Sequence, residues 1–249
     1  MYYLLTLSDL GREAVQHSGS HHFADHIYVG KPSGRTALGR WLDARLLAMP
    51  AARAFRRRCE RSQRAIQQVL ESCGQGDGTV RILAVPCGIP RDLLDLVRTL
   101  RGRQASLLER LDYHGMDIDP EVLAEAMALT DECEVPSAHF HRGDALSAQE
   151  YPPGPFDLVV STGLGEFLQP DELVRFYGHV HRVLRPGGVF FTSATARDSS
   201  SDLLLRMIEL VTQYRSADEV QRLLQCLPWR EVRLTRERSG LQTFVMATK

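Results

Sequence analysis

"FDLVVSTGLGEFLQPDELVRFYGHVHRVLRPGGVFFTSA", residues 156–194, contains a complete strand–helix–strand pattern in one run. It opens with a continuous apolar segment of strand length, passes into a helical pattern that begins at Pro170 and is followed by Pro-Gly-Gly, and closes with a second apolar segment. Proline in the first turn and glycine after the last turn are typical helix boundaries. The run therefore predicts one unit of a parallel sheet covered by helices.

The same alternation extends towards the N-terminus as far as residue 80. Apolar runs of strand length are followed by segments with leucines or alanines at helical spacing. The predicted strands are "VRILAVP" (80–86), "LDYHGMD" (111–117) and "SAHFHRGD" (137–144), and the predicted helices are "RDLLDLVRTLRG" (91–102) and "PEVLAEAMALT" (120–130).

The C-terminal end breaks the alternation. "REVRLTRERSGLQTFVMATK" (230–249) predicts two strands joined through Ser239-Gly240, which is an antiparallel hairpin. The segment 202–216 carries apolar residues at helical spacing and predicts a helix packed on the sheet. The fold class is therefore α/β, a doubly wound and mostly parallel seven-stranded sheet with an antiparallel C-terminal hairpin.

Residues 1–79 do not follow this pattern. Residues 35–72 are rich in helix formers and interrupted at Pro50, and "GQGDG" (74–78) resembles a flexible junction. We predict two domains, an N-terminal helical cap or lid over residues 1–79 and a main domain over residues 80–249. The basic run "RAFRRR" (53–58) is interpreted as a solvated helix face, because acidic residues flank it and no aromatic pattern accompanies it.

Composition restricts the classes of function. The chain has 249 residues, 43% of them hydrophobic, and a net charge of −1, so the totals do not indicate a nucleic-acid partner. The five cysteines show no C-x-x-C spacing, and the N-terminus has neither a basic region before an apolar one nor the length of a membrane span. We expect a soluble cytoplasmic protein that does not bind a membrane.

Ligands of an open parallel sheet bind at the carboxyl ends of its strands. At these ends the sequence places Pro86, Cys87 and Gly88, then Asp117 with Ile118, then Asp144 with Ala145, and then Ser161, Thr162 and Gly163. Carboxylates there can accept hydrogen bonds from ribose hydroxyls and from an adenine amino group. The pattern predicts a pocket for an adenosine-containing ligand.

The segments "ILAVPCGIPRDLL", "GMDIDPEVL", "HRGDAL" and "FDLVVS…FL…HRVLRPGGVFF", followed by the hairpin, resemble class I S-adenosylmethionine-dependent methyltransferases over residues 80–249. The resemblance implies S-adenosylmethionine as cofactor. It implies that Asp117 binds the ribose, that Asp144 and the backbone of Ala145 bind the adenine, and that Ser161-Thr162-Gly163 border the methionine half and the methyl group.

The first turn departs from the family pattern, acidic-x-Gly-x-Gly-x-Gly. Here Ala84 stands in the acidic position, prolines occupy positions 86 and 90, and Gly88 is the one glycine retained. Each proline removes a backbone donor, although Pro90 suits the first turn of a helix. Arg91 or Asp92 is a candidate for contact with the amino-acid end of the cofactor.

Methyl transfer is an in-line displacement, so a base is needed only if the acceptor must lose a proton. Glu166 is the candidate base, and His22 and Tyr28 are candidates for contact with the acceptor from a loop-like stretch of the cap (residues 21–35). We predict no metal site, because Ser18-Gly19-Ser20 interrupts the histidine-rich segment.

The predicted function is methyl transfer to oxygen, nitrogen or carbon of a small molecule, by a chain that does not bind nucleic acid and forms a homodimer. Two alternatives remain open: a scaffold that keeps the fold without binding the cofactor, and an enzyme that uses the cofactor's charge for a cyclisation. A dinucleotide-dependent dehydrogenase is disfavoured, because the glycine fingerprint and its spacing to an acidic residue do not match.

Overall fold

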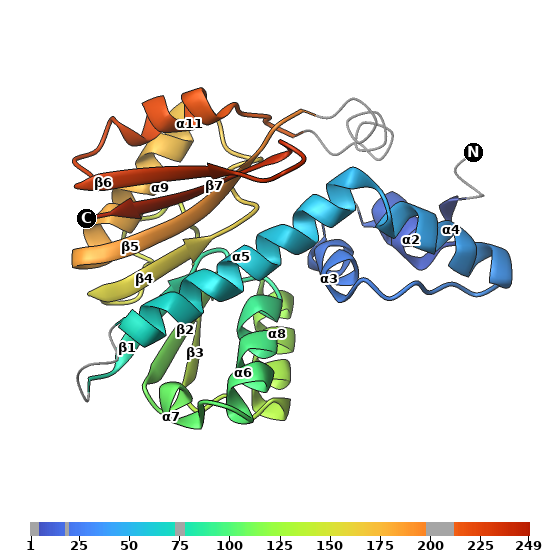
Figure 1. Cartoon of the computed structure of the whole chain (residues 1–249), viewed down its shortest axis with the longest axis horizontal. Coiled ribbons are helices and arrows are strands. Elements are labelled where there is room, and N and C mark those ends of the chain that lie inside the picture. The colour runs from blue at the N-terminus through green and yellow to red at the C-terminus, as the bar shows by residue number, and fades with distance from the viewer. Residues whose placement is uncertain (1–4, 18–19, 73–77, 198–211) are drawn as a thin grey trace.

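The computed structural model describes residues 5–17, 20–72, 78–197 and 212–249. A single seven-stranded sheet with the order β3-β2-β1-β4-β5-β7-β6 forms its centre (Figure 1). The strands are β1 (Val80–Ala84), β2 (Leu111–Asp117), β3 (Ala138–Arg142), β4 (Phe156–Ser161), β5 (Leu184–Thr195), β6 (Glu231–Arg236) and β7 (Gln242–Thr248). Strand β7 is antiparallel to both β5 and β6, and the other pairings are parallel. The predicted fold class is confirmed.

Helices cover both faces of this sheet. They are α2 (Asp9–Gln16), α3 (His21–Val29), α4 (Ala37–Leu47), α5 (Pro50–Ser72), α6 (Arg91–Arg101), α7 (Ala105–Leu108), α8 (Pro120–Glu132), α9 (Pro170–Val183) and α11 (Ala217–Leu224). Within the described ranges, no helix combines the length and the apolar composition needed to cross a bilayer.

Local sequence explains why the helices that border the ligand edge begin where they do. The Asp119 side chain accepts a hydrogen bond from the amide of Glu121 and so caps α8, with Pro120 in its first turn. A capping box between Gln169 and Glu172 starts α9, again with a proline in the first turn. These caps fix the residue at which each helix begins, and both helices begin on the same edge of the sheet.

The helix predicted to reach Pro186-Gly187-Gly188 ends earlier, at Val183. Strand β5 begins at the next residue, Leu184, which pairs with Phe156, and after a register shift Val189 pairs with Leu158. The residues between them, including Gly187 at φ 75°, form the irregular start of the strand. The glycines therefore serve a bulge instead of a helix stop.

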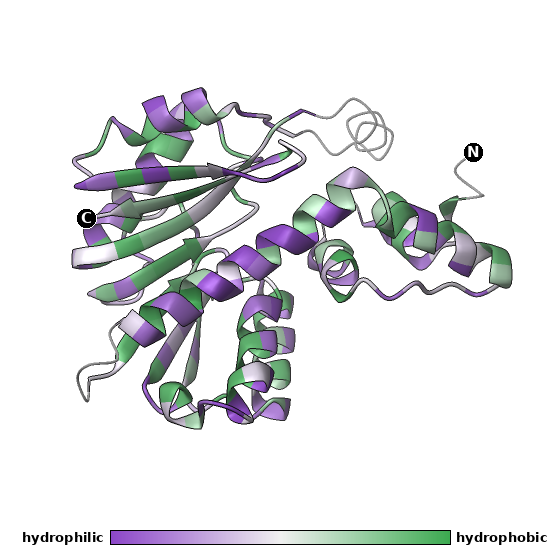
Figure 2. Cartoon of the chain, in the orientation of Figure 1, coloured by the Kyte–Doolittle hydropathy of each residue, from purple (hydrophilic) through white to green (hydrophobic). Residues whose placement is uncertain are grey.

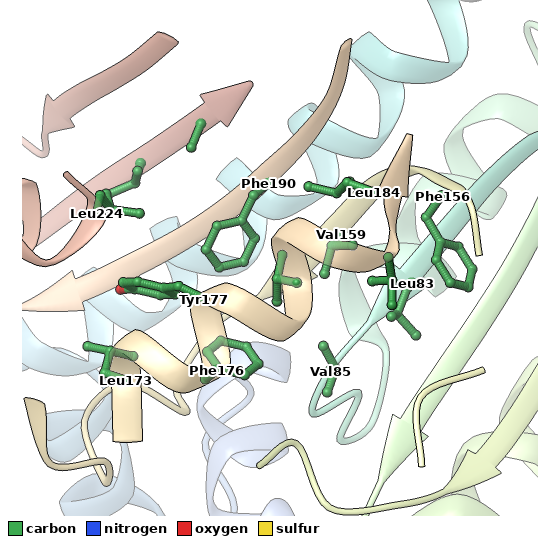
Figure 3. Packing of buried hydrophobic residues seen from close by; sticks show 14 of the residues in the cluster. Leu83, Val85, Phe156, Val159, Leu173, Phe176, Tyr177, Leu184, Phe190 and Leu224 are labelled. Atoms are coloured by element: carbon green, nitrogen blue, oxygen red, sulfur yellow. The ribbon is translucent and has the colours of Figure 1, made fainter. Parts of the chain in front are cut away.

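The core has two layers, one on each face of the sheet. On one face, aromatic rings of α9 pack on β5, and the centroid of the Tyr177 ring lies 5.5 Å from that of Phe190 (Figure 3). On the other face, Ile66 and Leu70 of α5 join leucines of α6 against the central strands. Strands β4 and β7 are apolar over most of their length, whereas the edge strand β6 is largely hydrophilic and α5 alternates apolar and hydrophilic positions (Figure 2), as expected for a helix with one buried face.

The N-terminal helices α2, α3 and α4, here called the cap helices, lie at the far end of α5 from β1 (Figure 1). Helix α5 connects them to the sheet and contributes its second half to the sheet's core. The division into domains at residue 79 stays a prediction. In the structure, the residues that pack apart from the sheet, including Leu10, Ile27 and Leu47, come from the chain before the middle of α5.

Local structure was also predicted for the stretches 21–35 and 202–216. The stretch 21–35 was expected to be loop-like, but its first part is the helix α3, capped by Ser20, whose side chain accepts from the amide of Phe23. The helix predicted over 202–216 lies mostly outside the described residues. Residues 212–216 are described and are not helical.

Candidate active site

A cavity of about 780 Å³ lies at the carboxyl ends of β1, β2 and β4, against α3 and α5. Strand order reverses at β1, which pairs with β2 on one side and with β4 on the other, so the cavity occupies the position expected for a ligand of this sheet. Eleven of the fourteen predicted site residues line it: Pro86, Cys87, Gly88, Arg91, Asp117, Ile118, Thr162, Gly163, Glu166, His22 and Tyr28.

The turn after β1 retains one open position, at Gly88. Its φ is 51°, a conformation that side chains disfavour, and a Cβ added there would meet no atom within 4 Å. The amide of Cys87 donates to the carbonyl of Met116, at 2.9 Å between nitrogen and oxygen. Burial raises the pKa of the Cys87 thiol, so this thiol stays protonated and unreactive near neutral pH. The turn thus presents backbone to the cavity in spite of its prolines.

Asp117 links the ends of β1 and β2. Its carboxylate accepts hydrogen bonds from the amide of Gly88, at 3.0 Å, and from the amide of Asp119, at 3.2 Å. A carboxylate can accept about four hydrogen bonds, so capacity remains for a ligand. Ile118 follows with 63% of its surface exposed and lines the cavity. An acidic and an apolar side chain therefore stand together at this strand end.

Arg58 of α5 is a buried charge within the cavity wall. It is 3% exposed, and its Nε and Nη2 donate to the hydroxyl oxygen of Tyr28 at 3.2 and 2.7 Å. Its Nη1 lies 3.6 Å from Oε1 of Glu166. Burial opposes the charge, but Tyr28 and Glu166 outweigh it and raise the pKa of Arg58. The guanidinium is therefore a permanent, buried cation.

The same arginine explains a glycine after β4. Gly163 has a φ of 94°, and a Cβ added there would lie 3.4 Å from Nη1 and Nη2 of Arg58. A larger residue at this position would be strained and would press on the guanidinium. Helix α5 and the β4–α9 loop are thus fitted to each other at the cavity.

Glu166 is buried and only half satisfied. Its Oε1 accepts from the hydroxyl of Thr195 at 2.6 Å, whereas Oε2 has no hydrogen-bond partner among the residues that the structure describes. A buried carboxylate oxygen without a partner is costly, which makes this oxygen of a cavity-lining residue a candidate acceptor for a polar group of a ligand. Burial raises the pKa of the neighbouring Tyr28, which keeps that phenol protonated.

The cap helix α3 closes against the other side of the cavity through charges. Arg91, the first residue of α6, forms a two-point ion pair with Asp25, with Nη2 to Oδ2 at 2.9 Å. The residue predicted to contact the cofactor thus has a partner within the chain, while it still lines the cavity. His22 is more than half exposed and lies near Glu125 of α8.

Three predicted residues do not line the cavity: Asp144, Ala145 and Ser161. The amide of Asp144 donates to Glu150, and its Oδ1 accepts from the amide of Leu146, both at 2.8 Å. The preceding Gly143 donates to the carbonyl of Asp117 at 2.9 Å, so the segment adjoins the end of β2. Contact of these residues with an adenine stays a prediction.

Sequence reasoning missed Arg58. The interpretation of residues 53–58 as a solvated face is wrong for this residue, although Arg53 is exposed. A signal was present, because Arg58 is spaced by four residues from Ala54 and from Ser62, and all three are buried on one face of α5. The ion-pair partner of Arg91, Asp25, was also missed, since 66 residues separate the two.

Comparison with known proteins agrees with this fold. The architecture is that of class I S-adenosylmethionine-dependent methyltransferases, as the resemblance over residues 80–249 predicted. Residues 8–206 match the family model described as "Putative methyltransferase". The chain belongs to this methyltransferase family.

Individual relatives are more distant. A "Probable methyltransferase ltbC" from Aspergillus luteorubrus is 36% identical over 87 residues, which are 32% of this chain and 30% of that relative's length. A possible exported protein from Bordetella parapertussis shares the fold with a TM-score of 0.79 at 22% identity, over 99% of this chain and 85% of that one. Magnesium protoporphyrin IX methyltransferase from Synechocystis PCC 6803, with bound S-adenosylhomocysteine, gives 0.60 at 13% identity, over 90% and 93%.

Proposed function

We propose that the chain transfers a methyl group from S-adenosylmethionine to a small molecule bound between the sheet edge and α3. One observation carries the proposal: the glycine turn, the Asp117 carboxylate and the half-satisfied Glu166 all line a single cavity at the point where strand order reverses. Membership of a methyltransferase family supports it.

The residues present suit this cofactor. Asp117 would accept from the ribose hydroxyls, and Ile118 would cover one face of the adenine. Gly88 leaves space for close approach of the backbone. Arg58 would hold the cofactor's carboxylate. Its guanidinium carries five N–H donors, and the two bonds to Tyr28 leave others for a ligand. When bound, the cofactor supplies an electrophilic methyl group on a sulfonium.

The contribution of the chain is alignment, exclusion of water and management of one proton. Arg58, held by Tyr28 and Glu166, fixes the wall on the α5 side. Oε2 of Glu166 would accept the proton that the acceptor's nucleophilic atom loses. The protonated phenol of Tyr28 would donate to the acceptor or to the cofactor. His22 would contact the acceptor at the mouth of the cavity.

A small acceptor is favoured by the size and lining of the cavity. Its 780 Å³ falls within the range of about 300–1,000 Å³ for small-molecule sites. Phe167 lines it and is 52% exposed, and Phe23 and Phe55 line it too. Aromatic side chains at the opening favour an acceptor with an apolar or aromatic body and one ionisable group.

The remaining assignments are part of the same proposal. Balanced charge supports an acceptor that is not a nucleic acid. The described cysteines are free thiols, which supports a cytoplasmic location. We also propose that the chain assembles as a homodimer.

Titration with S-adenosylhomocysteine tests the cofactor site. We expect binding to the unmodified chain, and a dissociation constant raised at least about tenfold in Asp117→Asn, because one ribose hydroxyl would lose its charged acceptor. Asp131→Asn, an exposed carboxylate of α8, is the matched control. Binding that is absent from the unmodified chain would indicate a scaffold, and equal binding by both variants would overturn the role of Asp117.

The mass of a reaction product decides between the two enzymatic alternatives. A gain of one methylene unit in the acceptor is methyl transfer. A product that has the mass of the acceptor, formed in the presence of the cofactor, would indicate cyclisation.

A further inference from the structure

We propose that His21, His22 and Glu125 form a binding site for a divalent transition-metal ion of the Zn²⁺ class, which joins cap helix α3 to α8 at the mouth of the cavity. The three side chains offer one ligand atom each, and these atoms all lie within 4.8 Å of one another. The histidines come from the first turn of α3 and the glutamate from the middle of α8, 104 residues later.

The separations between the ligand atoms already resemble those of a metal centre. Nε2 of His21 lies 3.2 Å from Oε2 of Glu125, and Nδ1 of His22 lies 3.7 Å from the same oxygen. Zinc ligands at bonds of about 2.0–2.1 Å in a tetrahedron are separated from one another by about 3.3–3.4 Å. The two imidazole ligand atoms lie within 4.8 Å of each other, so rotation of the exposed His22 ring that closes this separation by up to about 1.4 Å would complete that geometry.

The type of ligand selects the ion. Two imidazoles and one carboxylate suit Zn²⁺ and its neighbours, whereas Mg²⁺ and Ca²⁺ prefer oxygen ligands alone. Three protein ligands leave at least one position for water or for an acceptor group. The site is also accessible, because the side chain of His21 is 17% exposed and that of His22 is 56% exposed.

The surroundings favour a cation as well. Glu13 lines the same part of the cavity and accepts from Ser20, the residue before His21, at 2.7 Å. The nearest strong positive charge of α6, Arg91, is engaged at two points by Asp25. An incoming ion would therefore meet carboxylates and a guanidinium whose charge is already compensated.

A metal at this place would have a mechanical effect. Helix α3 carries Tyr28 and lines the cavity, and described residues already link it to the main sheet domain through the pair between Asp25 and Arg91 and through the contact of His21 with Glu125. A bound ion would replace the second of these contacts by bonds from both histidines to α8 and so hold α3 more firmly over the cavity. The inference does not depend on the proposed methyl transfer, because it concerns metal binding and the attachment of α3.

Equilibrium dialysis and calorimetry with Zn²⁺, on protein first treated with a chelator, test the site. We expect one equivalent to bind with a dissociation constant at or below the micromolar range, and Mg²⁺ at millimolar concentration not to compete. Glu125→Gln is expected to weaken binding of that equivalent at least about tenfold, and His21→Gln with His22→Gln to abolish it.

Two control variants each remove a residue of the same type, a histidine or a glutamate, at a position outside the proposed site. His139→Gln removes an exposed histidine of β3, and Glu132→Gln removes an exposed carboxylate at the end of α8. Both are expected to bind Zn²⁺ as the unmodified chain does. The proposal is overturned if no equivalent binds, if Glu125→Gln binds as tightly as the unmodified chain, or if His139→Gln alone abolishes binding.

Hydrogen exchange gives a second readout. Zn²⁺ is expected to increase amide protection in α3 of the unmodified chain and to leave it unchanged in Glu125→Gln. Protection that rises equally in both would show that the ion acts at another place and would overturn the attachment through α8.

Discussion

Replacing Arg58 by methionine tests whether this arginine belongs to a buried ion pair or to a solvated helix face. The guanidinium donates twice to Tyr28 and faces Glu166 at 3.6 Å, with 3% of its surface exposed. Removing one member of a buried pair costs about 3–5 kcal/mol, because the other charge is left without compensation. Methionine retains much of the apolar packing of the side chain, so we expect the free energy of unfolding to fall by about 3 kcal/mol.

In a chain of this length, about 1 kcal/mol corresponds to a shift of about 2–4 °C in the melting temperature. Arg58→Met should therefore melt about 6–12 °C below the unmodified chain, and urea unfolding should give the same loss of stability. Arg53→Met is the matched control, since Arg53 lies on the exposed face of the same helix. Its free energy of unfolding should change by less than about 0.5 kcal/mol.

A double variant identifies the cause of the loss. Arg58→Met combined with Glu166→Gln removes the uncompensated charge together with its partner, so it should recover about 1–2 kcal/mol relative to Arg58→Met. Equal stability of Arg58→Met and Arg53→Met would refute the reasoning. A double variant that is less stable by the full sum of the single changes would show that the two side chains do not interact.

Three further outcomes follow from particular contacts. Gly88→Ala should lower the free energy of unfolding by about 1–2 kcal/mol because of the positive φ at this position, and it should weaken binding of S-adenosylhomocysteine in calorimetry. Gly102→Ala, at a φ of −85°, should leave both quantities unchanged. Asp43 accepts four hydrogen bonds in the cap helices, which outweigh its burial and lower its pKa to about 2. Its stabilisation should persist above about pH 4 and be lost as the pH falls towards 2, and Asp43→Ala should increase hydrogen exchange in α2–α4 at pH 7. Burial lowers the pKa of His114 and of His141, so the folded chain binds fewer protons than the unfolded one. The contribution of these two histidines to stability should therefore be lost as the pH drops below about 6.5, and His141→Gln should make the loss of stability on acidification smaller in urea unfolding; a dependence unchanged by the variant would contradict it.

Most of the sheet was predictable because its signals are local. A buried parallel strand is a continuous apolar run, and Pro120 and Pro170 mark helix starts by the same geometry in any context. The end of α9 was predicted two residues late, at Arg185 instead of Val183, since the glycines after it form a bulge in β5 that depends on pairing with β4. Pairing between strands is not a property of one segment.

The ligand edge of the sheet was encoded in the order of the segments, because parallel strands that alternate with helices bring their carboxyl ends to one side. That rule was enough to bring Gly88, Asp117 and Glu166 to one cavity. The contacts made by α3 and α5 could be identified only from the tertiary structure. Arg58 is a buried cation, Arg91 pairs with Asp25, and Glu125 lies beside two histidines, because helices distant in sequence pack against the same opening. The partner of a charge depends on three-dimensional proximity, which no local pattern of residues specifies.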